Sequence, residues 1–197
     1  MRYDDEHKEK TRAKVLQVAS RAIREDGPGG VGVAAIMAEA GLTHGGFYAH
    51  FKSKDDLVTE AIGQMFRDAS GKFAATTGDM PPAEALAAYI GFYLSRSHRD
   101  VRSAGCPLPS LSADLARLPA EAQGVFGGGV ARLTGYIAEK LQAMGEPEPQ
   151  ALAGSVLSEL VGAVSLARAV ADPVQSDAIL KASRASLRAR LGLEALR

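Results

Sequence analysis

Apolar residues recur at helical spacing along most of this chain, and no segment shows the alternation that is typical of a β-strand. The first apolar stripe predicts an amphipathic helix over residues 5–25, with lysines and arginines on its other face. Its apolar members are Val15, Leu16, Val18, Ala19, Ala22 and Ile23. Glycine and proline at residues 26–30 predict its end.

Two short apolar segments and one long segment come next. Ile36 and Met37 predict a short helix over residues 33–40, which Gly41 ends. We expect Thr43 to cap a second short helix, whose Phe47 and Phe51 are four residues apart and therefore share a face. A serine at position 53 with an acidic residue three positions later resembles a capping box, and predicts a long helix over residues 54–73. Its inward residues are Leu57, Val58, Ile62, Met65 and Phe66.

Breaks rich in proline and glycine divide the rest of the chain into further helices. We expect helices over residues 83–97, 120–144 and 150–171, a short helix ending at residue 118, and a last helix running to residue 191. Asp172, Pro173 and Gln175 form a start signal for that last helix. The glycines at 127–129 weaken the 120–144 helix by roughly 1 kcal/mol each relative to alanine. The prediction is an all-α fold of roughly nine helices.

Composition narrows the class of protein. The 197 residues are 46% hydrophobic, which suffices for the core of one or two small domains. The formal net charge is zero, so any nucleic-acid binding must come from a local arrangement of charge. A single cysteine excludes an internal disulfide framework. The charged start and the lack of a run of eighteen apolar residues lead us to expect a cytoplasmic protein without a membrane partner.

The two short helices joined by residues 41–43 predict a helix-turn-helix. In that motif the second helix enters the major groove of DNA, with its first residues nearest the base edges. Histidine, tyrosine and lysine supply hydrogen bonds and charge, and the glycine pair permits close approach of the backbone. Taken singly, each residue could equally serve a turn or the packing, so the hypothesis rests on their combination. The candidate DNA-binding residues are Thr43, His44, Gly45, Gly46, Tyr48, His50, Lys52 and Lys54.

Residues 41–57 resemble the signature of the TetR family, Gly-Leu-Thr/Ser…Gly…Phe/Leu-Tyr-x-His-Phe-x-Ser-Lys-x-x-Leu. The residues in register are Gly41, Leu42, Thr43, Gly45, Phe47, Tyr48, His50, Phe51, Ser53, Lys54 and Leu57. The resemblance implies a three-helix DNA-binding domain at 1–53, and a helical effector-binding and dimerisation domain at 54–197. It also implies a homodimeric repressor that binds a palindromic double-stranded operator and is released by a small effector. Lys54 would meet a phosphate.

One feature departs from that family. Its members usually place threonine or serine at the start of the second helix, whereas residues 30–34 here carry no hydroxyl. Either a backbone amide substitutes, or one phosphate contact is missing. The basic residues of the first helix, Lys8, Lys10, Arg12 and Lys14, either add phosphate contacts or form a solvated face, because acidic residues are interleaved with them.

The last two helices are candidates for the dimer interface. Gly154, Ser158 and Gly162 permit close approach of another helix, and two such helices from each subunit would form a four-helix interface. The alternative is that the same stripes form the monomer's own core. Those stripes are Leu152, Val156, Leu157, Leu160, Val161 and Val164 in the first helix, and Ile179, Leu180, Ser183, Leu187 and Leu191 in the second.

The sequence predicts the effector site less clearly than the DNA-binding site. Its candidate aromatic residues are Tyr89, Phe92, Tyr93, Phe126 and Tyr136, which suit an apolar ligand, although aromatic residues at helical spacing more often form a plain core. Cys106 follows Arg99 and Arg102 with His98 nearby, and positive charge favours the reactive thiolate. Its surroundings resemble a TetR branch whose cysteine senses oxidants or electrophiles. The alternative for Cys106 is a small buried hydrophobe.

Other classes of function leave no pattern in this sequence. We find no nucleotide-binding glycine fingerprint, no metal-spaced histidine and cysteine cluster and no nucleophile elbow. We therefore expect neither enzymatic activity nor a cofactor. An enzyme with an unrecognised site, and a helix-turn-helix adaptor acting through protein contacts, stay as alternatives.

Overall fold

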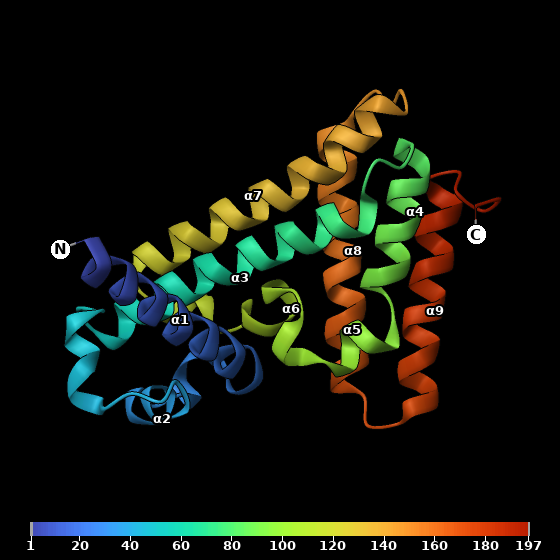
Figure 1. Cartoon of the computed structure of the whole chain (residues 1–197). Coiled ribbons are helices and arrows are strands. Elements are labelled where there is room, and N and C mark those ends of the chain that lie inside the picture. The colour runs from blue at the N-terminus through green and yellow to red at the C-terminus, as the bar shows by residue number, and fades with distance from the viewer. Residues whose placement is uncertain (1, 197) are drawn as a thin grey trace. The chain divides into compact units, whose positions relative to one another are not determined.

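A computed structural model describes residues 2–196, with side chains from Glu6 onward. All regular secondary structure in this range is helical, which confirms the predicted fold class (Figure 1). The first helix, α1, spans Arg2–Gly30. Gly27 interrupts it with a φ of 74°, a left-handed conformation that glycine adopts without strain. The predicted break therefore falls at Gly27, although helical turns resume as far as Gly30.

The helix-turn-helix follows in three elements. They are the α-helix α2 (Val33–Glu39), the 3₁₀-helix η1 (His44–Ala49) and the long helix α3 (Lys54–Thr77). The start of α3 is capped in both directions: the Ser53 hydroxyl accepts from the Asp56 amide at 3.1 Å, and the Asp56 carboxylate accepts from the Lys52 amide at 2.8 Å. This geometry confirms the predicted variant of the capping box. All five residues predicted to face inward from α3 are buried.

The remaining elements alternate long helices with short ones. They are α4 (Pro82–Tyr93), α5 (Arg96–Asp100), η2 (Arg102–Ala104), α6 (Pro107–Leu111), η3 (Leu115–Arg117), α7 (Ala120–Ala143), α8 (Pro149–Ala169) and α9 (Pro173–Arg190). The three consecutive glycines do not interrupt α7. The predicted start of α9 is confirmed, because the Asp172 carboxylate accepts from the Val174 amide at 2.9 Å.

One predicted helix, over residues 83–97, is wrong. It is divided into α4 and α5, because Ser95 caps a new helix by accepting from the His98 amide at 3.1 Å. The His98 ring also folds back, with Nδ1 2.7 Å from the carbonyl oxygen of Tyr93. The apolar pattern continues across this point, so hydrophobic periodicity alone did not reveal the break.

The chain divides into two compact units. Unit 1 contains residues up to Arg67 together with Arg102–Gly127, and unit 2 contains Asp68–Val101 together with the residues from Gly128 onward. Within unit 1, η2 and α6 pack against α1, so the helix-turn-helix belongs to a larger core than three helices. The predicted boundary at residue 53 separates a DNA-binding role from an effector-binding role and is not a boundary between packed units. It stays a prediction.

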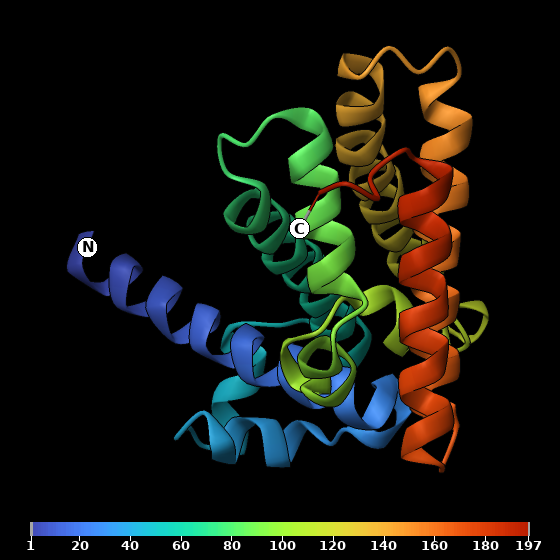
Figure 2. The ribbon, with the colours of Figure 1, turned by 90° about the vertical axis from the view of Figure 1, so that its right-hand side faces the viewer.

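Unit 2 is built around the antiparallel pair α8 and α9, which pack against each other. They lie side by side in Figure 1, and α9 lies in front of α8 in Figure 2. Among the described residues, α8 is the one helix long and apolar enough to cross a membrane by length and composition. Its inner face contacts α9 and α4, and seven of its residues are buried there. That packing is typical of a core helix.

Candidate nucleic-acid interface

The turn between α2 and η1 is fixed by backbone hydrogen bonds. Gly41 has a φ of 73°, and its amide donates to the Ala38 carbonyl at 2.9 Å. The next amide, that of Leu42, reaches back to the Met37 carbonyl at 2.9 Å. These two bonds satisfy carbonyls at the end of α2 and reverse the chain sharply. The predicted helix-turn-helix is therefore present.

Two phenylalanines anchor η1 to unit 1. Phe47 and Phe51 are 1% and 2% exposed, and their rings stack with centroids 5.6 Å apart. Tyr48 is 72% exposed, and its ring lies edge-on to that of Phe47 with centroids 5.2 Å apart. The burial predicted for both phenylalanines is confirmed, and η1 presents its remaining face to solvent.

The eight predicted DNA-binding residues lie in or next to η1, and none of them is buried. Five are exposed, namely Thr43, His44, Gly45, Tyr48 and Lys52, and three are half-buried, namely Gly46, His50 and Lys54. The structure therefore brings the whole set together in one short stretch of surface. Contact with DNA by each of them stays a prediction.

The expected cap by Thr43 is wrong. Its side chain makes no capping hydrogen bond, and its carbonyl instead accepts from the Gly46 amide at 3.1 Å. The reason is that η1 is a 3₁₀-helix, in which an i→i+3 backbone bond closes the first turn. The threonine hydroxyl is left exposed.

Arg12 makes contacts within the protein that the sequence did not predict, and a phosphate contact by its side chain stays a prediction. Its guanidinium lies 5.0 Å from the centre of the Phe51 ring and forms an ion pair with Glu60 on α3. It thus joins α1 to α3 while covering the buried ring. Lys10 pairs with Glu6 at 2.7 Å on the exposed face of α1. Lys14 extends towards the turn, with Nζ 3.6 Å from the position a Cβ would occupy at Gly41.

His50 carries a perturbed ring beside this cluster. Burial lowers the pKa of His50 below 6.5, and the positive charges of Lys8 and Arg12 lower it further. Its buried Nδ1 has no hydrogen-bond partner within residues 2–196. The ring is therefore neutral at pH 7, and an anion bound beside it would favour the protonated form.

The start of α2 shows the departure expected from the sequence. Its N-cap is Gly32, and no side chain caps the helix. A helix of this length without a hydroxyl leaves only backbone amides at that end.

The predicted effector residues are distributed over both units. In unit 2, four of them belong to one chain of aromatic contacts, with Phe73 contacting Tyr136 and Tyr89 at 5.2 and 4.6 Å, and Tyr89 contacting Tyr93 at 5.7 Å. His98 then contacts Tyr93 and Phe92 at 4.5 and 5.4 Å. Phe126 lies in unit 1 and packs edge-on against Phe66 at 5.4 Å.

Cys106 is 7% exposed and lies in unit 1 at the N-cap of α6. Two of the three positive neighbours expected from the sequence have partners elsewhere. Arg99 is bound to Asp100 and Asp177 at 2.6 and 2.8 Å, and His98 is bound to the Tyr93 carbonyl, all within unit 2. Activation of the Cys106 thiol by positive charge stays a prediction.

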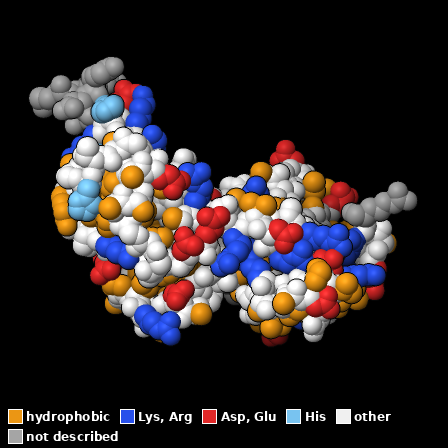
Figure 3. Space-filling view, turned by 90° about the horizontal axis from the view of Figure 1, so that it is seen from below, with side chains coloured by type: hydrophobic (Ala, Val, Ile, Leu, Met, Phe, Trp, Pro, Cys, Tyr) orange, Lys and Arg blue, Asp and Glu red, His pale blue; other side chains and the backbone are white. Residues whose placement is uncertain are grey.

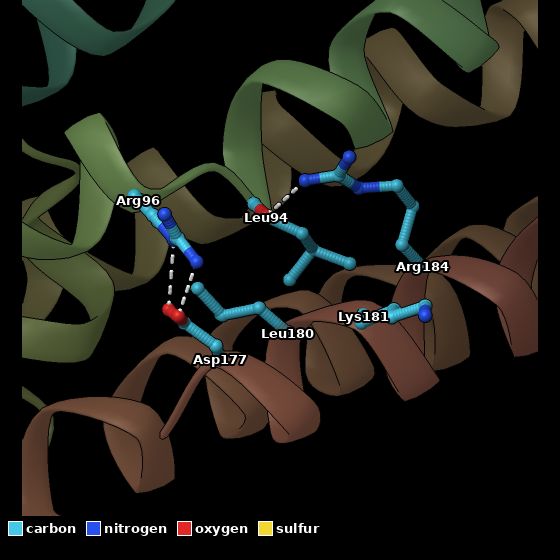
Figure 4. Close-up of a pocket in the computed structure, with 6 residues that line it drawn as sticks. All are labelled: Leu94, Arg96, Asp177, Leu180, Lys181 and Arg184. Atoms are coloured by element: carbon cyan, nitrogen blue, oxygen red, sulfur yellow. Dashed lines mark hydrogen bonds and ion pairs between the residues drawn. The ribbon is translucent and has the colours of Figure 1, made fainter. Parts of the chain in front are cut away.

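Sequence reasoning missed one hollow in unit 2. A pocket of about 250 Å³ lies between the α4–α5 junction and α9, and none of the predicted effector residues lines it (Figure 4). The signal was the spacing of Asp177, Lys181 and Arg184, which puts all three on one face of α9. Residues 2–196 contain no group of three or more histidine, cysteine and carboxylate side chains placed to hold a metal ion.

A buried aromatic anchor, an exposed polar short helix and a glycine turn define a helix-turn-helix DNA-binding transcriptional regulator. Residues 15–61 match the family model described as bacterial regulatory proteins of the tetR family. The segment that contains the helix-turn-helix is thus similar to the TetR family of transcriptional regulators. None of the curated proteins matches it in sequence.

Solved structures of the same fold cover nearly the whole chain. The reduced form of NemR from E. coli is 18% identical, with a TM-score of 0.80 over 91% of this chain and 96% of that one. A TetR family regulator from Agrobacterium tumefaciens is 22% identical, with a TM-score of 0.76 over 91% and 98%. A TetR regulator from Chloroflexus aurantiacus is 20% identical, with a TM-score of 0.76 over 95% and 96%. These likenesses establish the fold.

Proposed function

We propose that this chain is a ligand-responsive repressor that binds a palindromic operator as a homodimer, in the cytoplasm, and has no enzymatic activity. The observation that carries the proposal is the exposed polar face of η1, held on the buried pair Phe47 and Phe51. One such short element contacts few base pairs. Two of them in a symmetric dimer read two half-sites, and thereby multiply the specificity.

The outer faces of α8 and α9 support a dimer. Most of the apolar stripe residues predicted for the interface are buried between α8 and α9 within one chain, so they belong to the core of unit 2. The face left uncovered carries Leu166 and Val174, which are 59% and 75% exposed. Beside them, exposed Ala178, Ala182, Ala185 and Ala189 follow one another along α9. Small and apolar side chains on a helix pair suit close packing against a second copy.

Release by an effector requires a ligand that binds the DNA-incompetent state more tightly than the competent one. The aromatic chain around Tyr89 and Tyr93 supports an apolar effector, because it supplies ring surface inside unit 2. For Cys106, the support is its position: it begins α6, which packs on α1, the helix behind the helix-turn-helix. Oxidation would add polar atoms to a buried thiol and disturb that packing.

The DNA-binding proposal is tested with genomic fragments selected by the purified protein. We expect Tyr48→Ala and Lys54→Ala each to weaken binding to the selected operator about tenfold, the loss of one good contact. The matched control is Lys140→Ala, which removes a lysine from α7 outside η1. Unchanged affinity in both η1 variants would contradict the assigned face.

The adaptor and enzyme alternatives give a different result in the same assay. A DNA reader loses affinity steeply as salt rises, because phosphate contacts release counterions. A protein without a DNA partner shows no sequence-specific shift at any salt concentration.

The cysteine hypothesis has its own test: Cys106→Ser must abolish operator release by oxidants or quinones, and unchanged release rejects it.

A further inference from the structure

The pocket in unit 2 lies where the end of α4 faces α9. Its lining residues are Leu94, Arg96, Asp177, Leu180, Lys181 and Arg184, and its volume is about 250 Å³. The four residues from α9 are spaced by three, one and three positions, so they occupy one face of that helix. This face is roughly a third of a turn from the alanine-lined face of α9 proposed for the dimer, so the two surfaces are distinct.

The floor of the pocket is apolar. Leu94 and Leu180 are 0% and 3% exposed, and in Figure 4 they lie between Arg96 on one side and Arg184 on the other. A ligand in this pocket would therefore contact hydrocarbon in the middle and positive charge at the edges. This combination suits a small molecule with an anionic group and a short apolar part.

The charges of the lining do not balance. Asp177 is its one carboxylate, and it is already engaged by Arg96 at 3.0 Å and by Arg99 at 2.8 Å. Neither Lys181 nor Arg184 pairs with a carboxylate anywhere in residues 6–196. Figure 3 shows a band of lysine and arginine side chains in the right-hand part of the view. The pocket therefore has a positive edge without a counterion from the protein.

The Arg184 guanidinium has a hydrogen-bond donor without an acceptor among the described residues. One of its Nη atoms donates to the Leu94 carbonyl at 2.5 Å, which aims the guanidinium across the pocket. Its Nε is buried and has no hydrogen-bond partner in the part of the chain that is described. A buried donor without an acceptor is unfavourable, and a carboxylate is the acceptor that a guanidinium binds best.

We propose that this pocket binds a small organic carboxylate, with its oxygens between Arg184 and Lys181 and its hydrocarbon part on Leu94 and Leu180. A volume of about 250 Å³ is at the small end for ligand pockets, which limits the occupant to a metabolite-sized acid. The site is separate from the aromatic chain and from Cys106. The proposal does not depend on DNA binding, because ligand binding to the pocket is measured on the protein without DNA.

The test is calorimetry or ligand-observed NMR on the full chain with hexanoate and with hexanamide, which has the same carbon chain but no charge. We expect hexanoate to bind and hexanamide to bind at least tenfold more weakly, and we expect added salt to weaken hexanoate. Arg184→Gln should weaken hexanoate about tenfold or more, as a charged hydrogen bond is lost. Lys181→Gln should weaken it about two- to fivefold, because that side chain is exposed.

Two controls keep the result interpretable. Arg190→Gln removes a cation from the same helix that pairs with Glu159 outside the pocket, and should bind hexanoate as the unaltered protein does. Arg184→Gln also removes the bond to Leu94, so its fold is checked by circular dichroism. Lys181→Gln removes no described hydrogen bond and tests the charge by itself. The proposal is overturned if hexanoate does not bind, if hexanamide binds equally, or if Arg190→Gln weakens binding as much as the two pocket variants.

Discussion

Acid should destabilise the fold through His98, a buried ring in the aromatic chain of unit 2. The side chain is 5% exposed, and burial lowers the pKa of His98 from 6.5 to about 4. The hydrogen bond with the Tyr93 carbonyl opposes this shift, whereas Arg168 on α8 and Lys72 on α3 add to it. The folded protein therefore holds the ring neutral at a pH at which the unfolded chain would protonate it.

The sign and size of the effect follow from linkage. Since the unfolded chain binds the proton more tightly, stability falls as the pH falls below 6.5, and the loss reaches its limit below pH 4. A pKa shift from 6.5 to about 4 corresponds to about 3 kcal/mol lost from the free energy of unfolding by pH 4. About 1.3 kcal/mol of this is lost between pH 7.5 and 5.5.

The assay is urea unfolding followed by circular dichroism at several pH values and one fixed protein concentration, since oligomers unfold in a concentration-dependent way. The comparison is His98→Gln, which keeps a donor for the Tyr93 carbonyl but does not titrate. We expect the difference in unfolding free energy between the two proteins to shrink with acid by the amounts above. Parallel pH profiles for the two proteins would refute the reasoning.

Three further predictions concern unit 1. Arg12→Ala should lower the free energy of unfolding by about 1 kcal/mol, since the ion pair with Glu60 is only partly buried. Lys10→Ala should lower it by less than about 0.5 kcal/mol, because its pair with Glu6 is exposed. Chemical denaturation measures both. Gly41→Ala should cost about 1–2 kcal/mol because φ is 73°, and Gly45→Ala should cost less than Gly41→Ala in thermal melts, since its added Cβ meets nothing within 4 Å. Operator affinity should rise as the pH falls from 7.5 to 6, because a phosphate beside His50 would raise its lowered pKa; an equal slope in His50→Gln, measured by fluorescence anisotropy, would contradict this role.

The sequence predicted those features that depend on near neighbours in the chain. The spacing of Phe47 and Phe51 was enough to predict the buried side of η1, and the serine and aspartate at 53 and 56 were enough to predict the start of α3. Both are interactions across one helical turn, so a local pattern contains all their participants.

Features made by distant residues could not be predicted in the same way. The break between α4 and α5 is different, because its interactions are local: Ser95 caps α5 and the His98 ring reaches the Tyr93 carbonyl, inside a stretch whose apolar pattern is continuous. The partner of Arg12 is 48 positions away, so the arginine looked like a solvated or phosphate-binding cation. The pocket forms because the end of α4 packs near α9, and no local sequence pattern predicts that packing. Such features depend on which distant residues come into contact in the folded chain, and a local sequence pattern does not contain that information.

The reciprocal cap at the start of α3 has a consequence for how fast and how tightly η1 can engage an operator. The Asp56 carboxylate accepts from the Lys52 amide and the Ser53 hydroxyl accepts from the Asp56 amide, so two hydrogen bonds already order the joint between η1 and α3 in the unbound protein. Little conformational entropy then remains to be lost there when DNA arrives. Pre-organisation of this kind lets a short helix with few contacts convert most of its binding energy into affinity.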